Sequence, residues 1–195
     1  MAWDTEGTRR KILDAAPAEF PARGPDGTTI ERIARRSGVH KERVYNYFGG
    51  KPGLFARVLQ EQLAVAAQSV PLESADADGV SDYAGRLYDY HRQSPVLVRL
   101  LLWEALAYPD EVPEEHVRRD SYGTKTALLE AGEADGSLGA SIPADLLNFL
   151  LLAVAGYWAA MPQVARMITS SSDDAEASAR QRASVVEAAR RLTKS

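Results

Sequence analysis

Side chains that suit contact with a nucleic acid gather between residues 40 and 51. Lys41 and Arg43 can meet phosphates or guanine edges, Asn46 can pair with adenine, and the hydroxyls of the neighbouring tyrosines reach phosphate. Lys51 stands directly before a proline, where the start of a helix would add free backbone N–H groups to its ammonium and form a phosphate seat. These residue types point to duplex DNA as the partner of this segment.

Two short helices joined by a tight turn are expected to position these side chains. Ile30, Ile33 and Ala34 recur at three- and four-residue spacing and give the first helix one apolar stripe. Gly38 can adopt the left-handed conformation that a helix end needs. A second helix follows, with Val44 on its apolar side. The pattern is that of a helix-turn-helix, whose second helix enters the major groove.

Hydroxyl residues and prolines mark further helix boundaries in this part of the chain. Thr28 or Thr29 can cap the first helix of the pair. Pro17 and Pro21 interrupt an earlier apolar pattern, and an interior proline costs about 3 kcal/mol and kinks a helix. We expect a bend near Pro17 and the end of that earlier helix around Pro21, before a loop over residues 24–27.

Four stretches within residues 8–55 stand in the order and spacing of one protein family. They read TRRKILDAA at Thr8–Ala16, TTIERIA at Thr28–Ala34, SGV at Ser37–Val39 and VYNYFGGKPGLF at Val44–Phe55. This first quarter of the chain resembles the N-terminal DNA-binding domain of the tetracycline-repressor (TetR) family. The resemblance implies a double-stranded DNA operator as partner, read by the second helix of the pair.

Residue chemistry and the resemblance together give the candidate DNA contacts, which are Thr29, His40, Lys41, Glu42, Arg43, Tyr45, Asn46, Tyr47 and Lys51. The family commonly has a small hydroxyl residue at the position of His40 and small or polar residues at those of Glu42 and Arg43. These departures leave the operator sequence open. Tyr47 suits the core as well as a phosphate contact, whereas Phe48 is assigned to the core.

Charge is unevenly distributed along the chain, although the net charge is −4. Residues 1–57 carry 11 Lys and Arg against 7 Asp and Glu, whereas the remaining 138 residues carry 12 against 20. The basic end coincides with the expected helix-turn-helix. An acidic remainder would keep DNA at that end of the molecule.

Composition bounds the location and the chemistry of the protein. There is no cysteine, so neither a disulfide nor a thiolate site can form. The N-terminus lacks the positive-then-apolar pattern of an export signal. The longest apolar run, residues 146–160, is interrupted by Asn148 and is short for a bilayer span. We expect a cytoplasmic protein without a membrane partner.

The remainder of the chain is expected to be wholly helical. Apolar spacing and prolines predict helices over residues 51–69, 80–93, 95–108, within 111–134, 143–161 and 173–192. The fold class is therefore all-α. A helix-turn-helix DNA-binding domain over residues 1–50 is joined to a helical ligand-binding and dimerisation domain over residues 51–195.

The helix expected over residues 143–161 is apolar on nearly every side, so every side must be covered. One face can go to the core and another to a second copy of the chain. A single helix-turn-helix reads few bases, whereas two copies read half-sites about 34–36 Å apart. The resemblance implies a homodimer through the last two helices. A monomer with a central penultimate helix is the alternative.

Members of the TetR family typically enclose a small-molecule pocket, and ligand binding releases DNA. The candidate lining residues here are Tyr88, His91, Trp103, Glu104, Tyr122, Phe149 and Tyr157, with Tyr90 and Trp158 as further aromatics. Trp103 with Glu104 is the preferred pair. A buried carboxylate at Glu104 would favour a cationic or hydrogen-bond-donating effector, whose identity the sequence leaves unknown.

Catalysis finds no support in the sequence. His40, His91 and His116 lie in different segments, and there is neither a phosphate-cradling GxxxxGK[ST] loop nor a GxSxG elbow. Glu114-Glu115-His116 could suggest a metal, but adjacent helical residues point apart. No catalytic residue, metal or cofactor is predicted. The alternatives to a ligand-released repressor are a helical interaction module without DNA binding and, less favoured, an enzyme.

Overall fold

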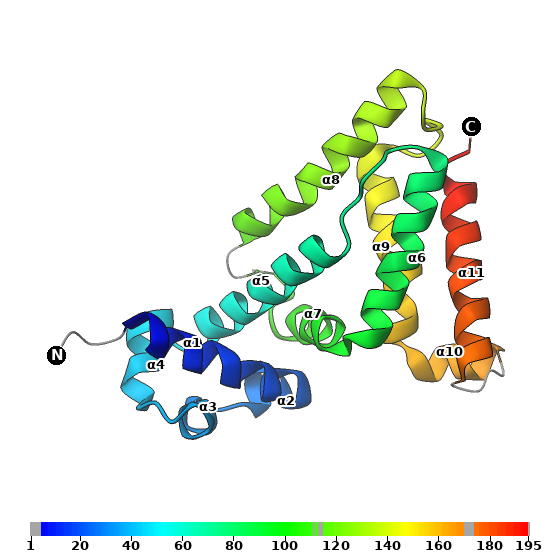
Figure 1. The fold of residues 1–195 in the computed structure, drawn as a ribbon. Helices are drawn as coiled ribbons and strands as arrows, with labels where there is room; N and C mark the ends of the chain where they lie inside the picture. The colour runs from blue at the N-terminus through cyan, green and yellow to red at the C-terminus, as the bar shows by residue number, and fades with distance from the viewer. Residues whose placement is uncertain (1–4, 111, 113–114, 170–173, 195) are drawn as a thin grey trace. The chain divides into compact units, whose positions relative to one another are not determined.

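The chain folds into α-helices, with no strand in residues 5–110, 112, 115–169 and 174–194, which are the residues that this computed structural model describes (Figure 1). The predicted all-α class is confirmed. Contacts divide the chain into two compact units. The head unit comprises residues 1–65 and 99–115, and the body unit comprises residues 66–98 and 116–195.

The head unit opens with α1 (Thr5–Ala15), a 3-10 turn η1 (Ala16–Ala18) and α2 (Phe20–Gly27). The chain does break near Pro17, which lies in η1. The expected helix end at Pro21 is wrong, because Pro21 lies in the first turn of α2, where a missing backbone N–H costs no hydrogen bond. Gly24 interrupts α2 at φ 69° and ψ 177°, so the expected loop is a broken helix.

The helix-turn-helix consists of α3 (Ile30–Ser37) and α4 (Lys41–Phe48). Thr29 is the N-cap of α3, and its hydroxyl accepts a hydrogen bond from the Arg32 backbone N–H at 3.3 Å. Gly38 ends α3 in the left-handed conformation with φ 67°, which a residue with a side chain rarely adopts. Ile33 and Val44 are fully buried and hold the two helices in place.

Two further helices, α5 (Lys51–Ser69) and α7 (Pro95–Ala107), have residues in both units. Within the head unit, Phe55 of α5 packs edge-on against Phe20, with ring centroids 5.1 Å apart. Trp103 of α7 donates a hydrogen bond from its indole Nε1 to the Pro21 carbonyl at 3.3 Å. A Cβ at Gly24 would lie 2.6 Å from the Trp103 ring, so glycine permits this close approach.

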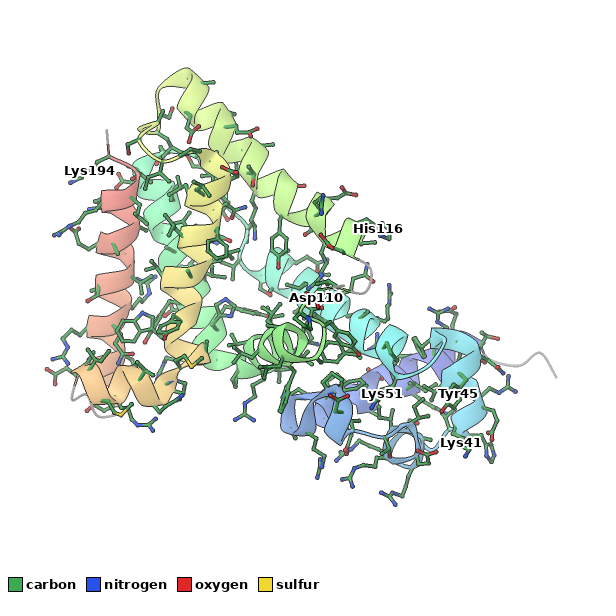
Figure 2. The ribbon with its side chains drawn as sticks, turned by 180° about the vertical axis from the view of Figure 1, so that it is seen from behind. Lys41, Tyr45, Lys51, Asp110, His116 and Lys194 are labelled. Atoms are coloured by element: carbon green, nitrogen blue, oxygen red, sulfur yellow. The ribbon has the colours of Figure 1, made fainter. Side chains whose placement is uncertain are left out.

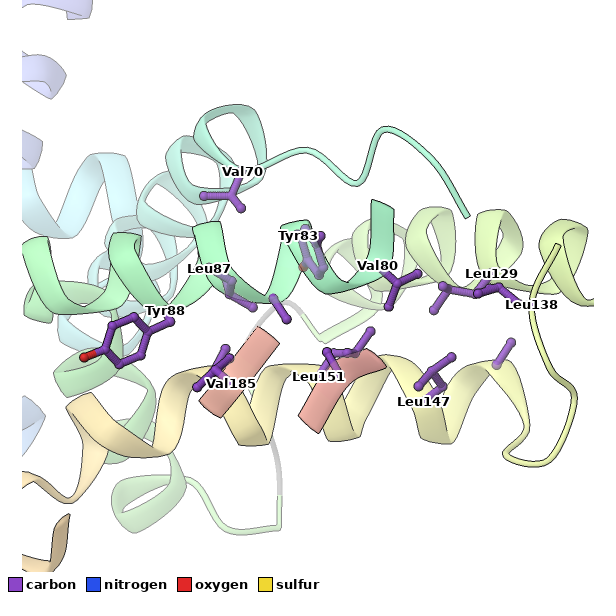
Figure 3. Close-up of a cluster of buried hydrophobic side chains, with 14 residues drawn as sticks. Val70, Val80, Tyr83, Leu87, Tyr88, Leu129, Leu138, Leu147, Leu151 and Val185 are labelled. Carbon is purple, nitrogen blue, oxygen red and sulfur yellow. The ribbon is translucent and has the colours of Figure 1, made fainter. Parts of the chain in front are cut away.

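The body unit contains α6 (Ala77–Gln93), most of α8 (Glu115–Asp135), α9 (Ala144–Ala160), α10 (Pro162–Thr169) and α11 (Ala175–Leu192). Helices α6, α9 and α11 lie side by side (Figure 1). Their shared core includes Tyr83 and Leu87 of α6, Leu147 and Leu151 of α9, and Val185 of α11 (Figure 3). Each fully buried leucine of this kind contributes about 1.5–3 kcal/mol. The sequence did not predict α10.

Helix α9 is only half covered within one chain. Leu147, Leu151 and Ala155 are fully buried, whereas Leu146, Phe149 and Tyr157 are 53%, 68% and 57% exposed. Among the described helices, none alone is long and apolar enough to cross a membrane. The pair α9 and α10 passes that test together by length and composition, but the two helices meet at 87°.

Candidate nucleic-acid interface and ligand cavity

The exposed face of α4 carries the side chains that suit DNA best. Lys41, Tyr45 and Asn46 are exposed, while Val44 points into the head unit and is fully buried. Figure 2 shows Lys41 and Tyr45 on α4 and Lys51 at the start of α5. Because Val44 is buried on one side of this two-turn helix, the polar residues on the opposite side are exposed to solvent. This face offers an ammonium, a phenol and an amide together.

The flanks of this face add further donors. His40 occupies the N-cap position of α4, is exposed, and makes no side-chain cap hydrogen bond. Arg43 and Tyr47 are half-buried. Lys51 is half-buried at the first position of α5, directly after the Gly49–Gly50 turn. Donors from the ends of two successive helices therefore border the α4 face.

Two aromatic rings close the C-terminal end of α4. Tyr47 and Phe48 stand edge to face, with ring centroids 6.4 Å apart. The guanidinium of Arg9 lies over the Phe48 ring, 5.5 Å from its centroid. Phe48 is half-buried rather than fully enclosed. The guanidinium of Arg9, from α1, is thereby held beside the C-terminal end of α4 by an aromatic face.

Acidic residues partly offset the charge of this surface. Glu31 of α3 lies 3.6 Å from the Lys41 ammonium, and both side chains are exposed. A hydrogen bond from its own backbone N–H, followed by the charge of Lys41, lowers the pKa of Glu31. An exposed pair of this kind contributes little to stability, so Glu31 holds the Lys41 ammonium only weakly. Glu42 is exposed on α4 itself.

A buried carboxylate that sequence reasoning missed holds α2 and α3 together. Glu19 is 4% exposed and accepts hydrogen bonds from Arg32 at 3.1 Å, Arg36 at 3.0 Å and Arg23 at 3.3 Å. Burial alone would raise the pKa of Glu19, but the hydrogen bonds from Arg32 and Arg36 and the charges of Arg32 and Arg23 lower it overall. The only sequence signal was an acid within an apolar pattern.

The nine candidate DNA contacts lie in α4, at the N-caps of α3 and α4 and at the start of α5. Of these, Thr29 is exposed and its hydroxyl is already used in capping α3. On α1, Arg10 is paired with Asp14 at 2.8 Å and with Glu61 at 3.2 Å, whereas Lys11 is exposed. The DNA roles of all nine residues remain predictions.

The candidate ligand residues are dispersed. Of the seven candidates, Tyr88 and His91 line the same cavity in the body unit, and Trp158, named from the sequence as a further aromatic, lines it with them. Trp103 and Glu104 belong to the head unit, where Trp103 bonds the Pro21 carbonyl and Glu104 is 7% exposed. The other three residues, Tyr122, Phe149 and Tyr157, are 38%, 68% and 57% exposed.

The cavity has a volume of about 260 Å³ and is lined by residues of α6, α7, α9, α10 and α11. Its apolar wall consists of Pro95, Ala155, Trp158, Ala159, Pro162 and Ala165. Its polar lining consists of Tyr88, His91, Arg92, Arg166 and Gln181. Of the residues that the sequence left out of the pocket, Gln181 is the least predictable, because α11 lies far along the chain from α6.

The polar lining is partly ordered by hydrogen bonds. The Tyr88 hydroxyl bonds the Gln181 side-chain oxygen at 2.8 Å. His91 is 6% exposed, and burial lowers its pKa to about 4. Its Nδ1 is buried without a hydrogen-bond partner among the described residues. The imidazole is therefore neutral at pH 7.

The possible metal ligands Glu114, Glu115 and His116 are only partly covered by the described residues. Glu114 lies outside the described residues, and Glu115 and His116 are the first residues of α8. Within the described residues, no group of three His, Asp or Glu could hold a metal ion.

Two family models match the chain. The model of bacterial regulatory proteins of the tetR family matches residues 12–58, which contain the helix-turn-helix. The model of the tetracyclin repressor-like C-terminal domain matches residues 78–191, which is more than half of the chain. The first match coincides with the stretches that suggested the resemblance, and the second extends it to the body unit.

Similar proteins agree with these matches. The HTH-type transcriptional repressor SCO4008 of Streptomyces coelicolor is 38% identical over 192 residues, covering 98% of this chain and 97% of the relative. The HTH-type transcriptional repressor NicS of Pseudomonas putida is 29% identical over 143 residues, covering 69% and 68%. The solved structure of SCO4942 from Streptomyces coelicolor is 28% identical, with a TM-score of 0.78 and coverage of 95% and 97%.

These matches confirm the resemblance that the first quarter of the sequence carries. They also agree with the helix-turn-helix geometry of α3 and α4. The chain therefore belongs to the TetR family of transcriptional regulators, and it is a DNA-binding repressor rather than an enzyme.

Proposed function

We propose that this repressor binds a two-fold operator as a homodimer and leaves it when a small molecule enters the cavity of the body unit. The exposed α4 face is the observation that carries the DNA-binding part. In this proposal α4 lies in the major groove, with Lys41, Arg43 and Asn46 toward base edges and Tyr45 toward phosphate. Lys51 and the first N–H groups of α5 hold a phosphate beside it.

The exposed apolar side of α9 supports the dimer. Leu146, Phe149, Ala153 and Tyr157 are exposed and recur at spacings of three and four residues, so they form one stripe. Leaving such a stripe in water is costly, whereas a second copy can cover it in a two-fold interface. The neighbouring α11 presents small and charged residues beside it. We assign α9 and α11 to the dimer interface.

The cavity supports release by an effector. It is bordered by the start of α7, and the same helix continues into the head unit, where Trp103 bonds the Pro21 carbonyl. A ligand that binds more tightly to one orientation of α7 shifts the population toward that orientation. The two heads of the dimer then no longer match the half-site spacing. A cytoplasmic location fits this role.

Selection of bound duplexes from a random pool tests the DNA-binding proposal and supplies the operator. Lys51→Ala should weaken binding to the operator and to unrelated duplexes by a similar factor, because a phosphate contact carries no sequence information. Arg43→Ala should instead change the base preference at one position in each half-site. Gel shifts and a repeated selection with each variant measure both effects.

Arg57→Ala is the matched control, because Arg57 is exposed on α5 but bonds Gln60 and Glu61 on its own helix. It should leave the affinity unchanged. Unchanged affinity in Lys51→Ala would remove Lys51 from the interface. A uniform loss in Arg43→Ala would make Arg43 a phosphate contact.

A further inference from the structure

The cavity of the body unit has an uneven charge. Two guanidinium groups, those of Arg92 and Arg166, belong to its lining, and the described lining contains no Asp or Glu. Both arginines are exposed, so they stand at the mouth rather than in the interior. Arg166 makes no ion pair with any described residue. The guanidinium of Arg166 therefore gives the mouth of the cavity a positive charge.

The remaining polar lining adds no negative charge. Tyr88 and Gln181 are neutral and bonded to each other at 2.8 Å. Burial lowers the pKa of His91 to about 4, so the imidazole carries no charge at pH 7. The nearest carboxylate on α6, that of Asp89, is bonded by Arg182 at 2.7 Å and does not line the cavity. The lining is neutral inside and positive at the rim.

One wall of the cavity is apolar and aromatic. The Trp158 indole stands edge-on to the Tyr88 ring, with centroids 6.4 Å apart and planes at 85°. Ala155, Ala159 and Pro162, whose side chains are small and apolar, belong to the same lining. A planar ring or short chain can lie against such a wall and bury its apolar surface.

We propose that the effector is a small organic anion whose carboxylate is held by Arg92 and Arg166 and whose apolar body lies against Trp158. Guanidinium groups bind carboxylates through paired hydrogen bonds, and a charge at the rim keeps part of its hydration. The cavity volume of about 260 Å³ limits the effector to a small molecule. This inference rests on the proposed effector role of the cavity. It differs from the cationic effector that a buried Glu104 would have favoured, since Glu104 lies in the head unit.

Three probes that share one ring system test the charge. They are 1-naphthoate, 1-naphthamide and 1-naphthylmethylammonium, titrated into the DNA-free protein at pH 7 by calorimetry. The naphthoate should bind at least about tenfold more tightly than the amide, and the cation most weakly, because paired hydrogen bonds to charge are the stronger ones. Equal or tighter binding of the amide or the cation would overturn the proposal.

Variants then locate the site. Arg92→Gln and Arg166→Gln should each weaken naphthoate binding about five- to tenfold and leave the amide unchanged, whereas Trp158→Ala should weaken both probes alike. The control is Arg57→Gln, which removes the same charge from a pair with Glu61 on α5, outside the cavity lining. If Arg166→Gln left the affinity for naphthoate unchanged, the carboxylate would not bind at the mouth of this cavity.

Operator binding by the ligand-free protein is measured separately. The effector role of the cavity and the anionic class of its ligand can therefore be contradicted by different results. Naphthoate that binds in the cavity without releasing the operator upholds the ligand class and contradicts the effector role. Release of the operator by the amide or the cation, with naphthoate inert, upholds the effector role and contradicts the ligand class.

Discussion

At the scale of single residues, two buried titratable groups have environments made by distant segments. Glu19 accepts hydrogen bonds from arginines of α2 and α3. His91 of α6 is buried beside α9, and a Cβ added at Gly156 would lie 3.7 Å from its ring. The first is an anion satisfied by three cations. The second is a neutral imidazole whose pKa is lowered by burial. Each therefore has a distinct effect on stability.

Glu19→Gln should destabilise the head unit by about 2 kcal/mol, because three arginines lose charge-assisted hydrogen bonds to a buried acceptor. Urea unfolding measures the loss. Asp14→Asn is the control, since Asp14 also pairs with an arginine but both side chains are exposed, and it should cost less than about 0.5 kcal/mol. Equal losses in the two variants would show that burial of Glu19 is unimportant.

His91 should make stability fall as the pH is lowered from 6.5 toward 4. Its pKa in the folded protein, about 4, lies below its ordinary value of 6.5, so the unfolded chain takes up a proton that the folded chain refuses. The contribution is complete above pH 6.5 and is lost below it by at most about 1.4 kcal/mol per pH unit. Unfolding midpoints between pH 5 and 7 should show this slope, and His91→Gln should reduce it. An unchanged slope in His91→Gln would contradict the assignment.

At the scale of elements, α4 and α9 pose opposite problems. On α4, Val44 faces inward and the polar residues face water, so one chain is enough to bury the apolar side of this short helix. On α9, Leu147 and Leu151 are buried, but the opposite side exposes Phe149 and Leu146. A helix with two apolar sides needs two partners, and one chain provides only the first.

Phe149→Glu should convert the proposed dimer into a monomer, because a charge on each copy would face the two-fold axis of an apolar interface. Sedimentation velocity measures the change. Stability of the monomer should shift by less than about 0.5 kcal/mol, since Phe149 is 68% exposed within one chain.

Leu106→Glu is the matched control for this change. Leu106 is 74% exposed on α7 in the head unit, so the same apolar-to-acid substitution there should leave the dimer intact. Dissociation of both variants, or of neither, would remove α9 from the interface.

At the scale of the whole molecule, the charge of the chain and the proposed symmetry determine how it meets DNA. Residues 1–57 are net basic and the remainder is net acidic, although the whole carries −4. In a dimer the two basic segments would face one duplex, and the acidic bodies would be repelled from it. Affinity should then depend on how far apart the half-sites lie.

The selected operator should contain two half-sites whose centres are about 34–36 Å apart. Inserting five base pairs between them should reduce affinity to that of an isolated half-site, because one head would face the wrong side of the duplex. The slope of log affinity against log salt should be about twice as steep for the full site as for the half-site. Fluorescence anisotropy at several salt concentrations measures both, and equal slopes would indicate binding by one head.

The sequence by itself determined most of the helices, the helix-turn-helix and the family, because these depend on local signals; α10 was missed. The spacing of Ile30 and Ile33, the turn at Gly38 and the inward Val44 act within a few residues of one another. Local signals also fixed α5 at residues 51–69. They misjudged Pro21, because a proline that ends one helix and a proline that begins the next look alike in sequence.

Only the tertiary structure decided which side chains share a site, because contacts between distant segments leave no periodic pattern. Helix phase and packing placed Trp103 and Glu104 in the head unit, and brought Gln181 of α11 to Tyr88 of α6. The same packing surrounded Glu19 with arginines and made the cavity cationic at its mouth. Helix content follows from neighbours in the chain, whereas the charge of a cavity follows from neighbours in space.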